Sequence, residues 1–167
     1  MLSQYKFREG TLNDLAQVKQ LGLLCFGTFF NQLSAEAKTN LEKSLQDENR
    51  IRHLLSHAKS FVCEYQNQII GMAYLVPSGT AHDVFENNWA VIRMVCVSPM
   101  HQGKNIAKQL TQQCIDYAKQ SDEKTIALHT SEMMNAARHI YEGFGFKILK
   151  EIEARFGKRY WLYLLKV

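Results

Sequence analysis

The sequence predicts a mixed α/β fold in which a central strand leads into a crossover helix. Segments with apolar residues at helical spacing alternate with short apolar segments rich in β-branched residues. The long apolar segment 89–97 stops just before Pro99, and helical spacing resumes a few residues later. No internal repeat, linker or low-complexity segment divides the chain, so we expect one domain over residues 1–167.

The N-terminal part is predicted to contain a strand followed by helices. Residues 3–8 alternate well enough to form the strand. Thr11 is a candidate N-cap for a helix over residues 11–27, because Asp14 follows at the spacing of a capping box. Residues 33–58 have the charge pattern of one or two amphipathic helices with a solvated outer face.

The remaining residues are predicted to supply most of the sheet. Residues 60–65 and 68–76 should form a hairpin, because a short polar turn joins two strand-like segments. The apolar segment 89–97 is typical of a central strand that is covered on both faces. The later elements are a helix over 105–120, a strand over 124–130, a helix over 134–145, and final strands over 146–154 and 158–167.

Composition and charge narrow the class of protein. The chain is 46% hydrophobic and 22% charged, which is ordinary for a globular protein with a real core. Its formal net charge is +4, and no run of five or more like charges occurs. A basic helix and a stacking-aromatic motif are both missing, so we expect no nucleic-acid partner. A small anionic ligand explains the mild positive charge equally well.

The four cysteines and the absence of long apolar segments indicate the compartment. Cys25, Cys63, Cys96 and Cys114 are far apart, and each has apolar neighbours. Buried free thiols in a reducing compartment are the expected state. No apolar segment approaches the roughly 18 residues of a membrane span, and the N-terminus has no signal-peptide core. We therefore expect a cytoplasmic protein without membrane association.

Residues 95–110 combine a strand, a polar turn and a helix start, an order suited to holding phosphate. Free backbone N–H groups and a partial positive charge gather at such a helix start. Gly103 allows close approach of a ligand, Lys104 and Lys108 add positive charge, and Ala107 is small. The glycine patterns of a P-loop and of a dinucleotide fingerprint are absent. By itself, the pattern also fits an ordinary strand–helix connection.

The same stretch resembles the acetyl-CoA-binding motif of the GNAT acetyltransferase superfamily. The matching residues are Val95, Val97, Pro99, Gln102 and Ala107. A second GNAT signature is similar to residues further on, with matches at Asn135, Ala136 or Ala137, Tyr141, Gly145 and Phe146. Residues 7–18 resemble the opening strand and helix of that superfamily. The resemblance implies a mixed, mostly antiparallel sheet of six to seven strands flanked by about four helices.

The resemblance also implies a reaction. It is acetyl transfer from acetyl-CoA to a primary amine of a small molecule or peptide, by direct attack in a ternary complex. A backbone N–H at or near Val97 would stabilise the oxyanion, and Tyr141 would be the general acid. Without the motif, Tyr141 is read as a half-buried aromatic residue. The implied cofactor-binding residues are Val95, Cys96, Val97, Gln102, Gly103, Lys104, Asn105, Ile106, Ala107, Lys108, Asn135 and Tyr141.

Two features depart from the family pattern or leave roles open. Asn105 stands where the motif usually has glycine, and asparagine is among the least unfavourable alternatives at positive φ. Asn135 suits either the pantetheine arm or a helix N-cap. The central strand offers no carboxylate as a general base, and solvent is an alternative. Other candidate bases are Glu64, His82, Asp83, Glu86, His129 and Glu132.

Some alternatives stay open at this level. His129 and Glu132 lack the spacing of a zinc-binding helix, and we expect no metal. A non-catalytic acyl-CoA-binding sensor or interaction module is the alternative function, favoured by Asn105 and the missing strand carboxylate. The apolar residues 160–165 suit either burial inside the sheet or pairing in a homodimer. The amine acceptor is not indicated.

Overall fold

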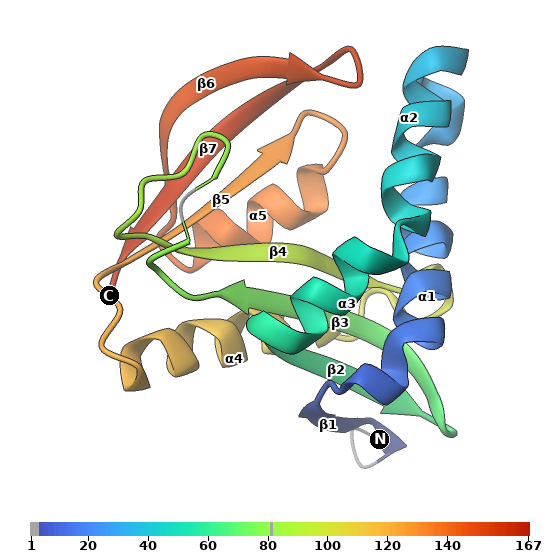
Figure 1. The fold of residues 1–167 in the computed structure, drawn as a ribbon, viewed down its shortest axis with the longest axis horizontal. Helices are drawn as coiled ribbons and strands as arrows, with labels where there is room; N and C mark the ends of the chain where they lie inside the picture. Colours follow the sequence, from blue (N-terminus) through green and yellow to red (C-terminus); the bar gives the residue numbers. More distant parts are fainter. Residues whose placement is uncertain (1–3, 81) are drawn as a thin grey trace.

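The computed structural model describes residues 4–80 and 82–167 and confirms the mixed, mostly antiparallel sheet (Figure 1). Within the described residues the sheet has seven strands in the order β1-β2-β3-β4-β5-β7-β6, and β4–β5 is the parallel pair among them. The strands are β1 (Lys6–Glu9), β2 (Lys59–Tyr65), β3 (Gln68–Val76), β4 (Ala90–Val97), β5 (Thr125–Ser131), β6 (Lys147–Arg155) and β7 (Lys158–Lys166).

Five α-helices occur in the described part of the chain, one more than the resemblance implied, because residues 33–58 form two. Asp47 causes that break, since its side chain accepts from the N–H groups of Asn49 and Arg50 and starts a new helix. The helices are α1 (Leu15–Gly27), α2 (Ala35–Gln46), α3 (Glu48–His57), α4 (Ile106–Gln120) and α5 (Asn135–Gly143).

The start of the chain is fixed by the predicted capping box. The carboxylate of Asp14 accepts from the backbone N–H of Thr11 at 2.8 Å. Arg8 of β1 contacts Asp14 at 2.8 Å and Glu64 of β2 at 2.9 Å. This guanidinium holds the pKa of the buried Asp14 carboxyl below its usual value. The predicted strand over residues 3–8 forms from Lys6, and Ser3 lies outside the described residues.

Helices cover both faces of the sheet (Figure 1). α1 and α3 pack on one face, while α4 packs on β2, β3 and β4 from the other. β4 contributes Ile92 and Val97 to the core under α4 and Cys96 to the core under α1 and α3. The expectation of a central strand buried on both faces is therefore confirmed.

Strands β4 and β5 separate soon after they begin to pair. Their parallel register holds only for Ala90 with Ile126 and Val91 with Ala127. Further along β4, Met94 has a positive φ of 55°, and the register with β3 shifts opposite it. This bulge bends β4 away from β5. The β5-facing backbone groups beyond Val91 are therefore left without a neighbouring strand.

The two hairpins form where the polar turns predict them. Gln66 and Asn67 both have positive φ, which suits the tight turn between β2 and β3. Phe156 and Gly157 have the same property between β6 and β7. β7 lies between β5 and β6, so the apolar strand 160–165 is inside the sheet and is not an edge for a second copy.

The thiols have the predicted environment. All four cysteines are buried and free. Within residues 4–80 and 82–167, no helix combines the length and apolarity that crossing a membrane requires.

Candidate active site

A cavity of about 870 Å³ lies where β4 leaves β5 and α4 begins. Its walls come from the end of α1, the second half of β4, the turn into α4, and residues 133–144. Eleven of the twelve residues implied by the motif line it: Val95, Cys96, Val97, Gln102, Gly103, Asn105, Ile106, Ala107, Lys108, Asn135 and Tyr141. Lys104 is the exception, because its ammonium lies over the ring of Tyr5 at 5.7 Å.

The turn into α4 exposes backbone amides to the cavity. The N–H of Ser98 donates to the carbonyl of Ile70 at 2.7 Å, which anchors the turn to β3. Gln109 makes the first bond of the α4 ladder, to the carbonyl of Asn105 at 3.0 Å. The N–H groups of residues 106–108 precede that bond and have no partner within the helix. Together with Lys108, they give the cavity an anion-binding end.

Gly71 of β3 sets the position of this helix start. A Cβ at Gly71 would lie 3.1 Å from side-chain atoms of both Ile106 and Leu110. A larger residue would push α4 away from the sheet, because such contacts are tighter than normal packing allows. The missing side chain therefore lets α4 bring its amides close to β4.

Asn105 adopts the conformation that the motif glycine would supply, with φ of 61° and ψ of 14°. Its side chain makes no capping hydrogen bond. We expect Asn105→Gly to bind acetyl-CoA equally well or more tightly, because glycine adopts positive φ without strain and removes a side chain from the cavity wall. Isothermal calorimetry measures this, and a large loss of affinity would show that the Asn105 amide contacts the ligand.

Tyr141 projects from α5 into the same cavity. It is 6% exposed, and its ring meets Phe146 edge-on at 5.9 Å between centroids. Among the described residues, its hydroxyl has no hydrogen-bond partner. Burial raises the pKa of Tyr141 above its ordinary value of 10, so the phenol is protonated at neutral pH. The side chain is thus both a packed aromatic residue and an available proton donor.

Asn135 also lies at the start of α5, although not as its cap. The helix begins at Asn135, and Met134 occupies the cap position. The alternative reading of Asn135 as an N-cap is therefore off by one residue. The Asn135 side chain remains on the cavity wall, where a ligand can reach it.

The six candidate bases lie outside this cavity. Glu64 is paired with Arg8, and Glu132 accepts from the backbone N–H of Arg159 at 3.1 Å. Glu86 is exposed in the loop before β4. The other three candidates, His82, Asp83 and His129, lie around Arg93 and Arg155. No carboxylate lines the described cavity.

Sequence reasoning missed the wall that α1 contributes. Cys25, Phe26, Thr28 and Phe29 border the cavity from the end of that helix. Met133 and Met134 close it from the other side. The available signal was the aromatic cluster at residues 26–30, which is unusually apolar for the end of a helix before a polar segment.

Comparison with known families agrees with this geometry. A sequence model of the acetyltransferase (GNAT) family matches residues 26–146, which include both cavity-forming segments. The chain belongs to the GNAT acetyltransferase family. The resemblance of residues 95–110 and 134–146 to GNAT signatures is thus supported by a match over most of the chain.

Curated relatives in this GNAT family are distant. "Probable N-acetyltransferase camello" of Xenopus tropicalis is 25% identical over 135 residues, which is 80% of this chain and 59% of that protein. "N-acetylaspartate synthetase" of Danio rerio is 28% identical over 93 residues, which is 56% of this chain and 31% of that protein. The chain therefore spans about three fifths or less of these relatives.

Solved structures share the GNAT fold along nearly the whole chain. PaiA N-acetyltransferase from Thermoplasma acidophilum, in complex with coenzyme A, has a TM-score of 0.78 at 14% identity. The alignment covers 98% of this chain and 99% of that one. NAA60 of Arabidopsis thaliana, in complex with acetyl-CoA, has a TM-score of 0.72 at 13% identity and covers 98% of each chain.

Proposed function

We propose that the protein is an N-acetyltransferase that moves the acetyl group of acetyl-CoA to a primary amine of a small molecule or peptide. The supporting observation is the cavity at the β4–β5 separation. It joins free helix amides, unpaired strand backbone and the protonated Tyr141 in one space. The helix amides suit a diphosphate, and the strand backbone suits an extended arm that contains amides. The proton of Tyr141 suits a leaving thiolate.

The residues present fit acetyl-CoA as a co-substrate. The amides of residues 106–108 and the ammonium of Lys108 suit the diphosphate. The backbone of Val95–Val97 faces the opening beside β5 and can pair with an extended arm as a sheet edge does. Val95, Cys96 and Ile106 give the walls an apolar surface.

When bound, acetyl-CoA supplies the acetyl group as a reactive thioester. We assign the oxyanion-binding role to a backbone N–H of β4 at or near Val97, because that part of the strand has no β5 partner. Tyr141 keeps its proton at neutral pH and donates it to the departing sulfur. The pKa of a thiol, about 8.5, is lower than that of the Tyr141 phenol, so a thiolate in water would not take this proton. The sulfur therefore accepts the proton as it leaves, while the cavity still shields it from water. The described cavity wall holds no carboxylate, so the proton of the amine passes to solvent or to one of the two histidines that line the wall, His101 and His139.

A thiol-release assay with acetyl-CoA and a panel of primary amines tests this proposal. We expect release of CoA thiol that depends on both substrates and gives intersecting double-reciprocal plots, as a ternary complex requires. Calorimetry with CoA serves as the control for a competent cavity. Heat of binding without thiol release on any amine would contradict the enzymatic proposal.

That same outcome would support the second candidate, a non-catalytic acyl-CoA-binding module. Two observations favour it: Asn105 replaces the motif glycine, and no carboxylate lines the described cavity. The position of Tyr141 argues for the enzyme, because its hydroxyl has no partner among the described residues and lies at the cavity wall, where a bound ligand can reach it.

A further inference from the structure

A second group of side chains lies on the opposite face of the sheet, at the point where β4 and β5 separate. Val91 and Ala127 form the last parallel pair, and both contact the apolar cluster around Phe85. Because side chains alternate along a strand, Arg93 and His129, two residues further on, lie on that same face. The stacking of Phe85 on His129, at 5.5 Å between ring centroids, agrees with this placement.

Arg93 is a half-buried cation without a carboxylate partner. Its Nη1 donates to Nε2 of His82 at 2.5 Å, and Nδ1 of His82 is 3.1 Å from the carbonyl of Thr80. Nε2 of His82 thus accepts from Arg93, and Nδ1 faces the carbonyl of Thr80 as a donor. No ion pair of Arg93 occurs in the described chain. Burial, followed by the charge of Arg50, lowers the pKa of Arg93 to about 10.

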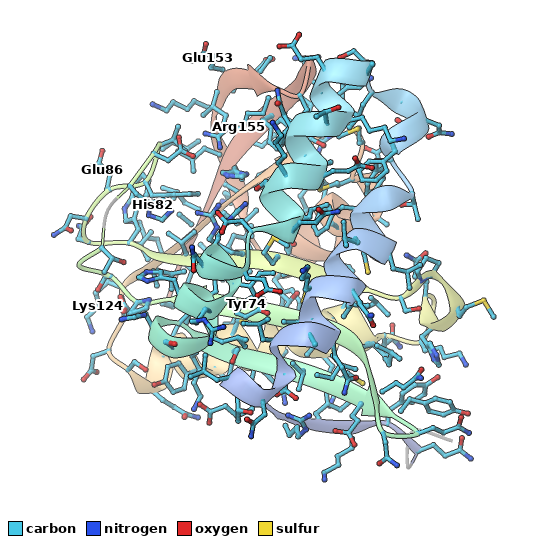
Figure 2. All side chains as sticks on the ribbon, turned by 45° about the vertical axis from the view of Figure 1, so that its right-hand side comes forward. Tyr74, His82, Glu86, Lys124, Glu153 and Arg155 are labelled. Atoms are coloured by element: carbon cyan, nitrogen blue, oxygen red, sulfur yellow. The ribbon has the colours of Figure 1, made fainter. Side chains whose placement is uncertain are left out.

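The nearest acid is already committed to another arginine. Arg155 at the end of β6 contacts both oxygens of Asp83, at 2.7 and 2.6 Å. Figure 2 labels Arg155 and His82, which come from β6 and from the loop after β3. Arg50 of α3 hydrogen-bonds the Ser44 hydroxyl, a neutral partner, and adds to the positive potential at Arg93.

His129 adds a buried hydrogen-bond donor without an acceptor. Its Nε2 accepts from Nη1 of Arg155 at 3.4 Å, which places the proton of the neutral ring on Nδ1. Nδ1 is buried and has no partner in the described structure. An unpaired buried donor costs free energy. Arg93 thus lacks a counter-charge, His129 lacks an acceptor for its N–H, and the two groups are near enough for the charge of Arg93 to act on His129.

We propose that Arg93 and His129 bind a carboxylate carried by the acceptor amine, so that the acceptor class is amino acids. This inference rests on the proposed N-acetyltransferase function. The planar guanidinium suits a carboxylate, because two parallel N–H groups match its two oxygens. Arg93 lies two residues before Val95 on β4. An amine a few bonds from the bound carboxylate can therefore reach the opening from the side opposite α4.

The first test compares each common L-amino acid with its own carboxamide in the thiol-release assay with wild-type protein. We expect kcat/KM for the best amino acid to exceed that for its amide at least tenfold. The amine of an amino-acid amide is less basic than the amine of the free amino acid, so a larger fraction of it is neutral and able to attack. Faster turnover of the free acid would therefore arise in spite of this chemical advantage of the amide. Equal or faster turnover of amides overturns this inference alone. Absence of thiol release with every amine overturns the proposed function as well.

The second test uses Arg93→Gln, with Arg52→Gln as a matched control. Arg52 is exposed on α3, so the control removes the same charge outside the group. We expect Arg93→Gln to raise KM for the amino acid about ten- to a hundredfold, the range for losing a hydrogen-bonded charge. KM for acetyl-CoA and turnover of the amide should stay unchanged, and Arg93→Lys should recover part of the loss. A parallel loss for acid and amide, or no loss for the acid, overturns the inference.

Discussion

We expect Tyr141→Phe to lower kcat about ten- to a hundredfold, which is at or just below the lower end of the range for loss of a general acid. In the proposed mechanism the phenol, protonated at neutral pH, donates to the departing sulfur, and the variant would force that thiolate to leave unprotonated. Only the oxygen is removed, and the ring keeps its packing against Phe146. Steady-state kinetics with saturating acetyl-CoA measures the effect, and the thermal midpoint should change little.

Tyr117→Phe provides the matched control for that experiment. Tyr117 lies on α4 with its ring edge-on to Phe61 at 6.3 Å, away from the residues that line the cavity. We expect it to keep wild-type kcat. Affinity for CoA, measured by calorimetry, should be the same in both variants. Unchanged turnover in Tyr141→Phe would remove this residue from the chemistry.

The second large effect is a loss of stability in mild acid, caused by His129. Burial, and then the charges of Arg155 and Arg93, lower the pKa of His129 from its ordinary 6.5 to about 4. Between these values the unfolded chain binds a proton at His129 that the folded chain does not. Stability is therefore fully present above pH 6.5 and falls as the pH approaches 4, by up to about 3 kcal/mol.

Urea unfolding at a series of pH values measures this decline. His129→Gln has no titrating group at the position, so the corresponding part of the pH dependence should disappear. Equal slopes in wild type and His129→Gln between pH 6.5 and 4 would show that another group carries the effect.

Local patterns were enough to predict the framework, and the resemblance to GNAT signatures indicated most of the residues that line the cavity. Residues 89–97 could be recognised as a central strand because they form a long apolar run. The turn into α4 could be predicted from the order of strand, polar turn and helix, and Asn105 proved to have the positive φ expected of it. These features depend on neighbours in sequence, so the sequence alone carries the information.

The separation of β4 from β5 and the group at Arg93 could not be predicted in this way. Methionine rarely adopts positive φ, so nothing at Met94 indicates the bulge that bends β4. Arg93, His129 and Arg155 come from three strands, and loop residues His82 and Asp83 complete the group. Only the strand order and register bring these residues together, and neither is a local property.

The early parting of β4 and β5 divides the sheet of the described chain into two blocks, β1–β4 and β5–β7, which are joined by two register pairs. A ligand that lies along the gap would bridge exposed backbone on β4 to the second block. The fraction of molecules with this ligand bound would then set how cooperatively the two blocks unfold. The resistance of the chain to proteolysis would therefore rise with the concentration of free co-substrate.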